Sequence, residues 1–468
     1  LPTHSVPRAR APAPAPSSAT AAPAGSGPLG GRDGVGDPYY PAAGASGYDA
    51  LRYAIDVAWD PATRTIAGTT TLTARAAQDL GVVHVDLALA ASAATVDGRP
   101  AAVAAGPGTD RAVTAPAAIR AGETFTVVLT YSGRPGALVA ADGTRPYAEA
   151  GDEMLIAGEP EASAAWFPAN DHPSDPATYD VRVRVPAGRQ ALSVGQLVSA
   201  DEDADPATAT WHWALEQPAS TYQTFLAVGD FALERGTDGG RPYVYAVSRR
   251  LDADARAAGL ARLKTTGAVV RALEARYGPY PFGQLGGVLT AVPLPWSGME
   301  CASRPVYASA EGLREWVLVH ELAHQWFGDR VALASWRDIV DNEGWATFAQ
   351  WTLDAPGLNT PVDADARLVG QWGTGSTTPL ADPGRENLFG AGSYGGGARA
   401  LLALRNVLGA ATFDRLAREW AQSEGPRSLA DFRALAERVS GRDLAAFWAA
   451  WYESAAPPPK TAAYGYPG

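Results

Sequence analysis

Hydrophobic residues recur with two different periods, which divide the chain into two halves. Between residues 37 and 234 apolar positions alternate with small or polar ones, as in the run that contains Tyr53, Ile55, Val57 and Trp59. This period of two is typical of strands that bury one face, and turn-forming Asp-Gly and Asp-Pro pairs separate the runs. The first half is therefore predicted to be a β-rich domain of sandwich or saddle type.

Beyond about Leu251 the apolar residues recur every three or four positions, which is the spacing of amphipathic helices. Two short strands, at 286–292 and 305–308, are predicted among these helices. The helices themselves are predicted at 257–277, 311–328, 342–353, 396–408, 412–421, 429–439 and 443–453. The second half is expected to be a mostly helical α+β domain, which makes the whole chain an α+β multidomain protein.

The two ends of the chain differ in composition from the halves between them. Residues 1–35 are rich in Ala, Pro, Ser and Gly, and such a segment buries too little apolar surface to become ordered. We expect a disordered tail at 1–35, a β-domain at 36–235, a second domain at 236–456 and a loose tail at 457–468. The first tail, and the absence of an initiator Met, lead us to expect a secreted protein whose signal peptide has been removed.

Charge and cysteine content narrow the class of function. The formal net charge is −12 and the pI is near 5.1, so a nucleic-acid partner is not expected, whereas a protonated peptide amine would be attracted. The single cysteine, Cys301, excludes an internal disulfide and a Cys-based zinc finger. No stretch reaches the ~18 apolar residues of a membrane span, so none is expected.

His320, Glu321 and His324 form the pattern most informative about chemistry, and Glu343 follows after eighteen intervening residues. Residues four apart on a helix lie on one face, one turn apart, so both imidazoles can bind one ion. Two His ligands and one carboxylate leave a fourth tetrahedral position open, as in catalytic zinc sites. We therefore predict one Zn²⁺ per chain, bound by His320, His324 and Glu343. Glu321 is predicted to act as general base toward water without binding the metal.

Several segments resemble the M1 family of zinc metallopeptidases, which includes the gluzincin aminopeptidases and the leukotriene A4 hydrolase group. VHELAHQWFGD at 319–329 is similar to the family's zinc helix, and NEGWATF at 342–348 to the segment that carries the third ligand. GME at 298–300 matches the core of the family's exopeptidase signature, and EPEA at 159–162 resembles a β-domain segment that reaches the active site. The resemblance implies an N-terminal β-domain followed by a thermolysin-like, mostly helical zinc peptidase domain.

The resemblance also implies roles for residues outside the zinc motif. Tyr394 would donate a hydrogen bond to the oxyanion of the intermediate. Glu300 would pair with the free α-ammonium of a peptide, so that one residue is released at a time. Substrate-binding roles are implied for Glu300, Met299, Gly298, Glu161 and Glu159. The function expected from the resemblance is that of a zinc-dependent aminopeptidase, a hydrolase that acts on peptides with a free N-terminus.

The sequence departs from the family pattern at several points. Cys301 stands where the exopeptidase signature has Asn, Gly396 where the family often has Lys, and Glu159 where many members have Gln. The large C-terminal helical domain of many members is missing from the sequence, which leads us to expect a more open groove between the two domains. These differences bear on substrate preference more than on the reaction.

Two other functions use parts of the same pattern. A zinc endopeptidase would share the metal chemistry, but Glu300 favours an exopeptidase. A catalytically inert peptidase-like binding protein would be expected to lack a metal ligand or the base, and both histidines, Glu321 and Glu343 are present. We predict a monomer.

Overall fold

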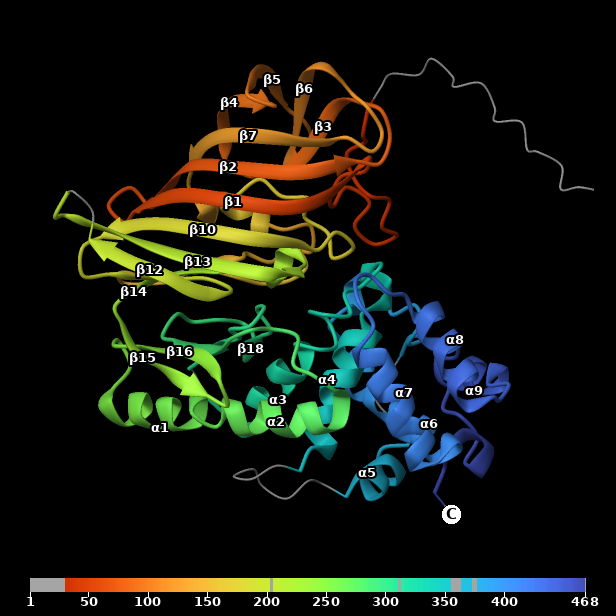
Figure 1. Ribbon diagram of the computed structural model, residues 1–468. Helices are drawn as coiled ribbons and strands as arrows, with labels where there is room; N and C mark the ends of the chain where they lie inside the picture. The colour runs from red at the N-terminus through yellow and green to blue at the C-terminus, as the bar shows by residue number, and fades with distance from the viewer. Residues whose placement is uncertain (1–29, 203–204, 310–312, 355–362, 373–376, 468) are drawn as a thin grey trace, which may run out of the picture.

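The computed structural model describes residues 30–202, 205–309, 313–354, 363–372 and 377–467, and it places a β-domain on top of a mostly helical domain (Figure 1). A ten-stranded sheet dominates the β-domain, and its strands follow the order β12-β13-β10-β1-β2-β7-β4-β5-β6-β3. The bounds of these strands are β1 (Tyr48–Asp60), β2 (Thr65–Ala76), β3 (Leu80–Asp86), β4 (Ala90–Val96), β5 (Arg99–Ala105), β6 (Asp110–Ile119), β7 (Thr124–Gly133), β10 (Ala177–Pro186), β12 (Gln196–Glu202) and β13 (Thr208–Ala219).

The alternating pattern of the first half is confirmed in β1, β2, β7 and β10. In β1, Tyr53, Ile55, Val57 and Trp59 are all buried, and the residues between them are more exposed. β1 pairs antiparallel with β2 and parallel with β10, so it lies inside the sheet with one face on the core. A smaller sheet, ordered β11-β14-β9-β8, contacts β10 and β13. Its strands are β8 (Tyr147–Ala150), β9 (Glu153–Ile156), β11 (Gln190–Leu192) and β14 (Leu226–Gly229).

The boundary between the domains lies a few residues before the predicted position at 235. β15 (Phe231–Asp238) and β16 (Arg241–Ser248) pair with each other, and β16 pairs in parallel with β17 (Leu285–Thr290). They therefore belong to the five-stranded sheet of the second domain, ordered β15-β16-β17-β19-β18, with β18 at Gly298–Met299 and β19 at Val306–Ala308. β15 still reads as a strand in the sequence, so the pattern did not mark the change of sheet and placed the boundary too late.

The helices of the second domain follow the predicted pattern with three exceptions. The predicted helix at 257–277 is two helices that meet at Lys264 and Thr265, and the short α5 was not predicted. The helix predicted at 311–328 spans only Glu315–His324, and residues 311–312 lie outside the described part. In the segment after it, Gly328 has a φ of 129°, which favours glycine. The bounds are α1 (Ala253–Leu263), α2 (Thr266–Tyr277), α3 (Glu315–His324), α4 (Val340–Thr352), α5 (Ala364–Gly370), α6 (Gly397–Leu408), α7 (Ala410–Ala421), α8 (Leu429–Ser440) and α9 (Ala445–Trp451).

Both ends of the described chain pack against the domains. The prediction of a loose tail at 457–468 is wrong for residues 457–467, because the Trp372 indole donates to Pro458 O and the Trp451 indole to Tyr464 O. The Tyr466 ring also packs edge-on against Trp372, 4.9 Å between centroids. Of the predicted disordered tail at 1–35, residues 1–29 lie outside the described part, and Gly34 and its neighbour hydrogen-bond to the segment at 43–44. None of the described helices has the length and apolar composition needed to cross a membrane.

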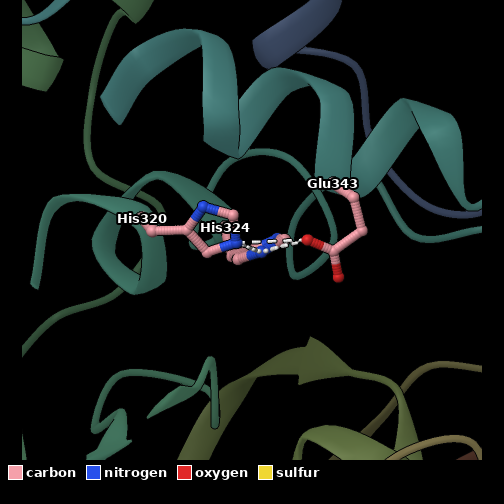
Figure 2. A group of neighbouring side chains, drawn as sticks. All are labelled: His320, His324 and Glu343. Atoms are coloured by element: carbon pink, nitrogen blue, oxygen red, sulfur yellow. Dashed lines mark hydrogen bonds and ion pairs between the residues drawn. The ribbon is translucent and has the colours of Figure 1, made fainter. Parts of the chain in front are cut away.

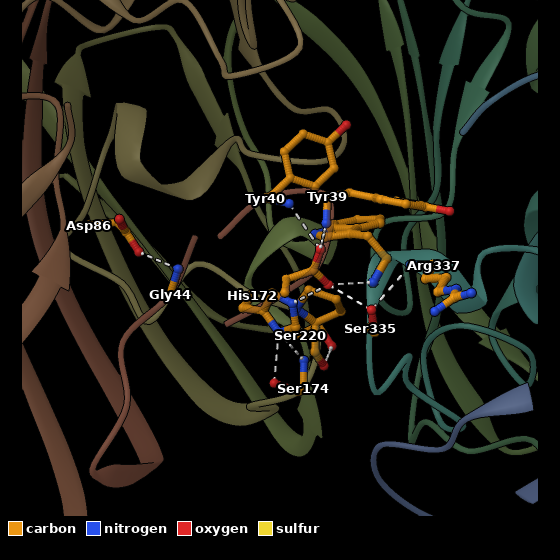
Figure 3. Close-up of polar contacts among 12 residues, drawn as sticks. Tyr39, Tyr40, Gly44, Asp86, His172, Ser174, Ser220, Ser335 and Arg337 are labelled. Atoms are coloured by element: carbon orange, nitrogen blue, oxygen red, sulfur yellow. Dashed lines mark hydrogen bonds and ion pairs between the residues drawn. The ribbon is translucent and has the colours of Figure 1, made fainter. Parts of the chain in front are cut away.

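Asp37 joins the two domains through a single buried carboxylate. Its donors are the backbone amides of Tyr39, Tyr40 and Trp336, the Ser335 hydroxyl and Nε2 of His172, at 2.8–3.2 Å. Figure 3 labels four of the residues that donate to it, Tyr39, Tyr40, His172 and Ser335. His172 belongs to the β-domain, whereas Ser335 and Trp336 belong to the second domain. Burial by itself raises the pKa of Asp37, but the hydrogen bonds from His172 and the three amides outweigh it and hold the pKa well below its usual range.

Replacing Asp37 with alanine is expected to destabilise the protein by about 3–5 kcal/mol, because it leaves several buried donors without an acceptor. Urea unfolding of the wild type and of Asp37→Ala measures this difference. Asp60→Ala is a matched control, since Asp60 accepts hydrogen bonds only within its own exposed turn and its loss should matter much less.

The pH dependence of this difference tests the same assignment. A carboxylate with a lowered folded-state pKa contributes stability above its unfolded-state pKa of about 4, and this contribution is lost as the pH falls through the folded value. The difference between wild type and Asp37→Ala should therefore be constant from about pH 5 to pH 7 and shrink below about pH 4. A difference that grows on acidification would contradict a charged Asp37.

Candidate metal centre and active site

Helices α3 and α4 bring His320, His324 and Glu343 to one buried point (Figure 2). Both histidines lie on α3, one turn apart, and Glu343 comes from the first turn of α4. Oε2 of Glu343 lies 3.1 Å from Nε2 of His320 and 3.4 Å from Nε2 of His324, and the two Nε2 atoms are 3.1 Å apart. The sequence prediction that these three side chains converge is confirmed.

The donor set fits a zinc ion. Nδ1 of His324 lies 3.0 Å from Phe327 O, and a hydrogen bond to this carbonyl puts the ring proton on Nδ1 and leaves a lone pair on Nε2. That lone pair, Nε2 of His320 and Oε2 of Glu343 then face one another, and a single proton can satisfy only part of this contact. A cation satisfies all three atoms. Two imidazoles and one carboxylate are ligands that Zn²⁺ accepts, with room for a fourth.

Glu321 and Tyr394 lie beside the three candidate ligands and line the same cleft, which has a volume of about 690 Å³. Glu321 is 6% exposed, and a Cβ at Gly298 would lie well inside van der Waals contact with its carboxylate. The backbone of β18 therefore passes directly against Glu321, and a side chain at position 298 would force the Glu321 carboxylate to move. The Tyr394 ring stacks near His320, with centroids 5.9 Å apart and an interplanar angle of 20°.

Two glycines place Tyr394 at this position. Tyr394 lies in a π-helical turn, Gly392–Gly396, that leads directly into α6. A Cβ at Gly344 of α4 would lie 3.0 Å from the Cα of Gly397 in α6, so the two helices cross with their backbones almost in contact. Because α4 also carries Glu343, this crossing sets the distance between the tyrosine and the candidate metal site.

Glu300 and Glu159 bring two further carboxyl groups into the cleft, one from each domain. Oε1 of each is buried and lacks a hydrogen-bond partner among the described residues. The backbone carbonyl of Glu300 accepts from Gln325, which fixes the segment after β18 to the end of α3. Burial, together with the nearby Glu300, raises the pKa of Glu159 well above its usual range.

Of the remaining predicted site residues, Met299 and Gly298 line the cleft and Glu161 does not. Met299 is 4% exposed and lines the cleft together with Gly298. Glu161 does not line it, because its carboxylate turns away and accepts from the backbone amide of Ala141 at 2.8 Å. The role proposed for Glu161 at the substrate amine is not supported by this placement.

Comparison with known proteins identifies the family. Models of the peptidase M1 N-terminal domain and of the peptidase family M1 domain match residues 49–223 and 304–367. The chain belongs to peptidase family M1. Among its relatives in this family is mouse "Aminopeptidase RNPEPL1", which is 31% identical over 252 residues, 52% of this chain and 33% of that protein. Rat "Aminopeptidase B" is 28% identical over 240 residues, 49% of this chain and 34% of that protein.

A solved structure extends the similarity over nearly the whole M1 chain. The M1 zinc metallopeptidase from Deinococcus radiodurans superimposes with a TM-score of 0.82 at 29% identity, over 91% of this chain and 98% of that one. The matches to the curated relatives, by contrast, span about a third of the length of those proteins. The two-domain arrangement is thus shared in full with the bacterial structure.

Two of the positions that depart from the M1 pattern have a structural explanation. Cys301 is fully buried, and burial raises the pKa of its thiol, so it acts as a packing residue. Glycine replaces the frequent M1 lysine at position 396, and the guanidinium of Arg399 lies in the adjoining space. Its Nη1 would be 3.2 Å from a Cβ at Gly395, and its Nη2 3.8 Å from a Cβ at Gly396. Arg399 also lines the cleft, a role that sequence spacing alone did not indicate.

The metal centre predicts one tightly bound Zn²⁺ per chain, lost when a ligand is removed. His324→Ala and Glu343→Ala should each weaken zinc binding at least a hundredfold, since even partners one step removed from the metal contribute about 10–100-fold. Competition with a chelating dye measures this affinity. His212→Ala is the control, because His212 lies on β13 and does not line the cleft. Wild-type affinity in His324→Ala would rule out this ligand set.

Proposed function

We propose that this M1 chain is a zinc-dependent aminopeptidase that removes the first residue of peptides with a free N-terminus. The observation that carries the proposal is the convergence of His320, His324 and Glu343 in a cleft that also holds Glu321, Glu159 and Glu300. The names of the relatives support it, as does a crystal structure of the Deinococcus radiodurans protein bound to the tripeptide Tyr-Ser-Ala.

Glu321 carries the proton in this mechanism. His320, His324 and Glu343 would hold a Zn²⁺ ion, whose Lewis acidity would polarise a carbonyl and make water more acidic. The Glu321 carboxylate takes a proton from the attacking water and returns it to the leaving amine. Its burial beside Gly298 fixes its direction and keeps bulk water from competing for the same contact.

Tyr394 stabilises the charge that develops during attack. Tyr394 lines the same cleft as Glu321, and its phenol hydroxyl can donate a hydrogen bond to the oxyanion. The α4–α6 crossing holds the ring in place before substrate arrives, so little reorganisation accompanies the reaction.

Glu300 and Glu159 distinguish an aminopeptidase from an endopeptidase. A buried carboxyl oxygen without a partner is unfavourable unless a cation or donor meets it. The α-ammonium of a peptide brings three N–H donors and a positive charge, and it fits two such oxygens facing one cleft. An internal peptide segment brings no ammonium and leaves both oxygens unsatisfied, which disfavours endopeptidase action. The retention of every ligand and of the base disfavours an inert binding protein.

We propose further that the protein is exported from the cell, is a monomer and has no nucleic-acid partner. The composition of the first 35 residues supports export, and the acidic net charge of −12 argues against nucleic acid. Cell fractionation and light scattering test the first two.

Aminoacyl-p-nitroanilides, each compared with its N-acetylated form, test the proposed activity. We expect hydrolysis of the free-amine substrates only, abolished by a zinc chelator and restored by Zn²⁺. Glu300→Ala should raise KM for free-amine substrates at least tenfold and narrow the difference between the two forms, because a charge-assisted contact is worth about 1.5–3 kcal/mol.

Hydrolysis of the acetylated substrates by the wild type would instead indicate an endopeptidase. If neither form is hydrolysed by protein that contains zinc, the inert binding protein is the better description.

The roles of Glu321 and Tyr394 predict large losses of kcat with zinc retained. Glu321→Gln should lower kcat roughly 10²–10⁴-fold, and Tyr394→Phe roughly 10²–10³-fold. Tyr243→Phe is the control, since this residue lies on β16 outside the cleft. Steady-state kinetics together with zinc content decide the result, and a Tyr394→Phe variant with wild-type kcat would remove Tyr394 from the mechanism.

A further inference from the structure

Two chemically different sets of side chains line the cleft. One set is the carboxylates and the candidate metal ligands, and the other includes Pro295, Trp296 and Trp316. Trp316 is 43% exposed, and in the described part of the chain few large apolar side chains are so open to solvent. A large exposed indole inside a cleft is more informative than a scattered surface residue, because it marks a place where an apolar group can be bound.

Helix geometry puts Trp316 beside the metal site. Trp316 precedes His320 by four residues on α3, so the two side chains share one face, about 6 Å apart along the axis. The indole thus lies one turn from the first ligand, on the wall of the cleft. Tryptophan at this position is not required by the zinc chemistry.

Two fixed points give the direction of a bound peptide, and this step rests on the proposed aminopeptidase function. The ammonium meets Glu300, and the bond to be hydrolysed lies at Glu321, which contacts the backbone of Gly298. The peptide therefore runs from Glu300 toward Gly298, antiparallel to the protein chain. β18 is the last strand in its sheet, and no described strand pairs with its other edge, so an extended peptide can lie along it.

The second residue of the substrate then reaches the segment that holds Trp296. An extended chain advances about 3.3 Å per residue, and beyond Gly298 the protein chain continues backward to Ser297, Trp296 and Pro295, all of which line the cleft. Helix α3 contacts β18, which brings Trp316 to the same side. We propose that Trp296 and Trp316 form a subsite for the side chain of the residue after the hydrolysed bond, and that this subsite selects aromatic or large aliphatic side chains.

Four dipeptides test this subsite in the zinc-loaded enzyme. They have the same first residue, and their second residue is Gly, Leu, Phe or Lys. The shared first residue is the one hydrolysed fastest in the p-nitroanilide series. We expect kcat/KM for Phe and Leu at least tenfold above Gly, the size of effect that apolar pockets give. Trp296→Ala and Trp316→Ala should each reduce this ratio at least threefold, and Trp316→Phe should retain most of it.

Val198→Ala is the matched control, because Val198 is 54% exposed but lies on β12, away from the cleft, and its ratio should equal that of the wild type. Binding of the same dipeptides to zinc-loaded Glu321→Gln, measured by calorimetry, should follow the same order without any reaction. This second measurement separates the subsite from catalysis.

Equal kcat/KM and equal binding for Gly and Phe would overturn the subsite, as would a preference for Phe that survives in both tryptophan variants. Strongest binding of Lys would point instead to a cation over the indoles and would also overturn it. Absence of hydrolysis for every peptide would refute the aminopeptidase, and the order of binding to Glu321→Gln would still decide the subsite.

Discussion

The imidazoles of His320 and His324 and the carboxylate of Glu343 are held in mutual contact, although each presents a lone pair to the others. Such a contact is unfavourable without a cation, so the fold must enforce it. Aromatic stacking does this: the Phe327 ring lies parallel to Trp345, 4.7 Å between centroids and 6° between planes. Phe327 follows the second ligand by three residues and Trp345 follows the third by two. The stack therefore ties the end of α3 to the first turns of α4. A bound metal would make the contact among the three side chains favourable and so stabilise the folded protein.

The remaining catalytic groups depend on how other elements meet this helix pair. The contact of Gly344 with Gly397 lets α6 approach α4 closely. This approach brings Tyr394, in the turn before α6, to the ligand site. Glu159 comes from the β-domain, so its distance from Glu300 is set by the contact between domains, to which Asp37 contributes with donors from both sides. A change far from the cleft can therefore alter the substrate's binding site by rotating one domain against the other.

The sequence was sufficient to predict the parts of the site in which spacing and chemistry coincide. His320, Glu321 and His324 share one helix, so their geometry follows from the helical period, and the alternation in β1 likewise marks its buried face. Contacts between segments far apart in the chain could not be predicted from the sequence. Nothing in the spacing shows that Arg399 reaches the space beside Gly395, that Trp316 lines the cleft, or that residues 457–467 pack against Trp372. The resemblance to M1 peptidases supplied Tyr394 and Glu300, but it also suggested Glu161, whose carboxylate lies elsewhere.

Buried polar atoms without hydrogen-bond partners in the cleft lower the stability of the fold, but they can bind a ligand. Oε1 of Glu159 and Oε1 of Glu300 both lack hydrogen-bond partners in the described part of the chain, and both residues line one cleft. A buried polar group left unpaired costs about 1–3 kcal/mol, more when charged. Replacing either glutamate with an apolar residue would remove that cost, so stability alone does not explain their presence. A ligand that brings positive charge and several N–H donors to this point would recover the lost interactions, and the amino end of a peptide has that chemistry.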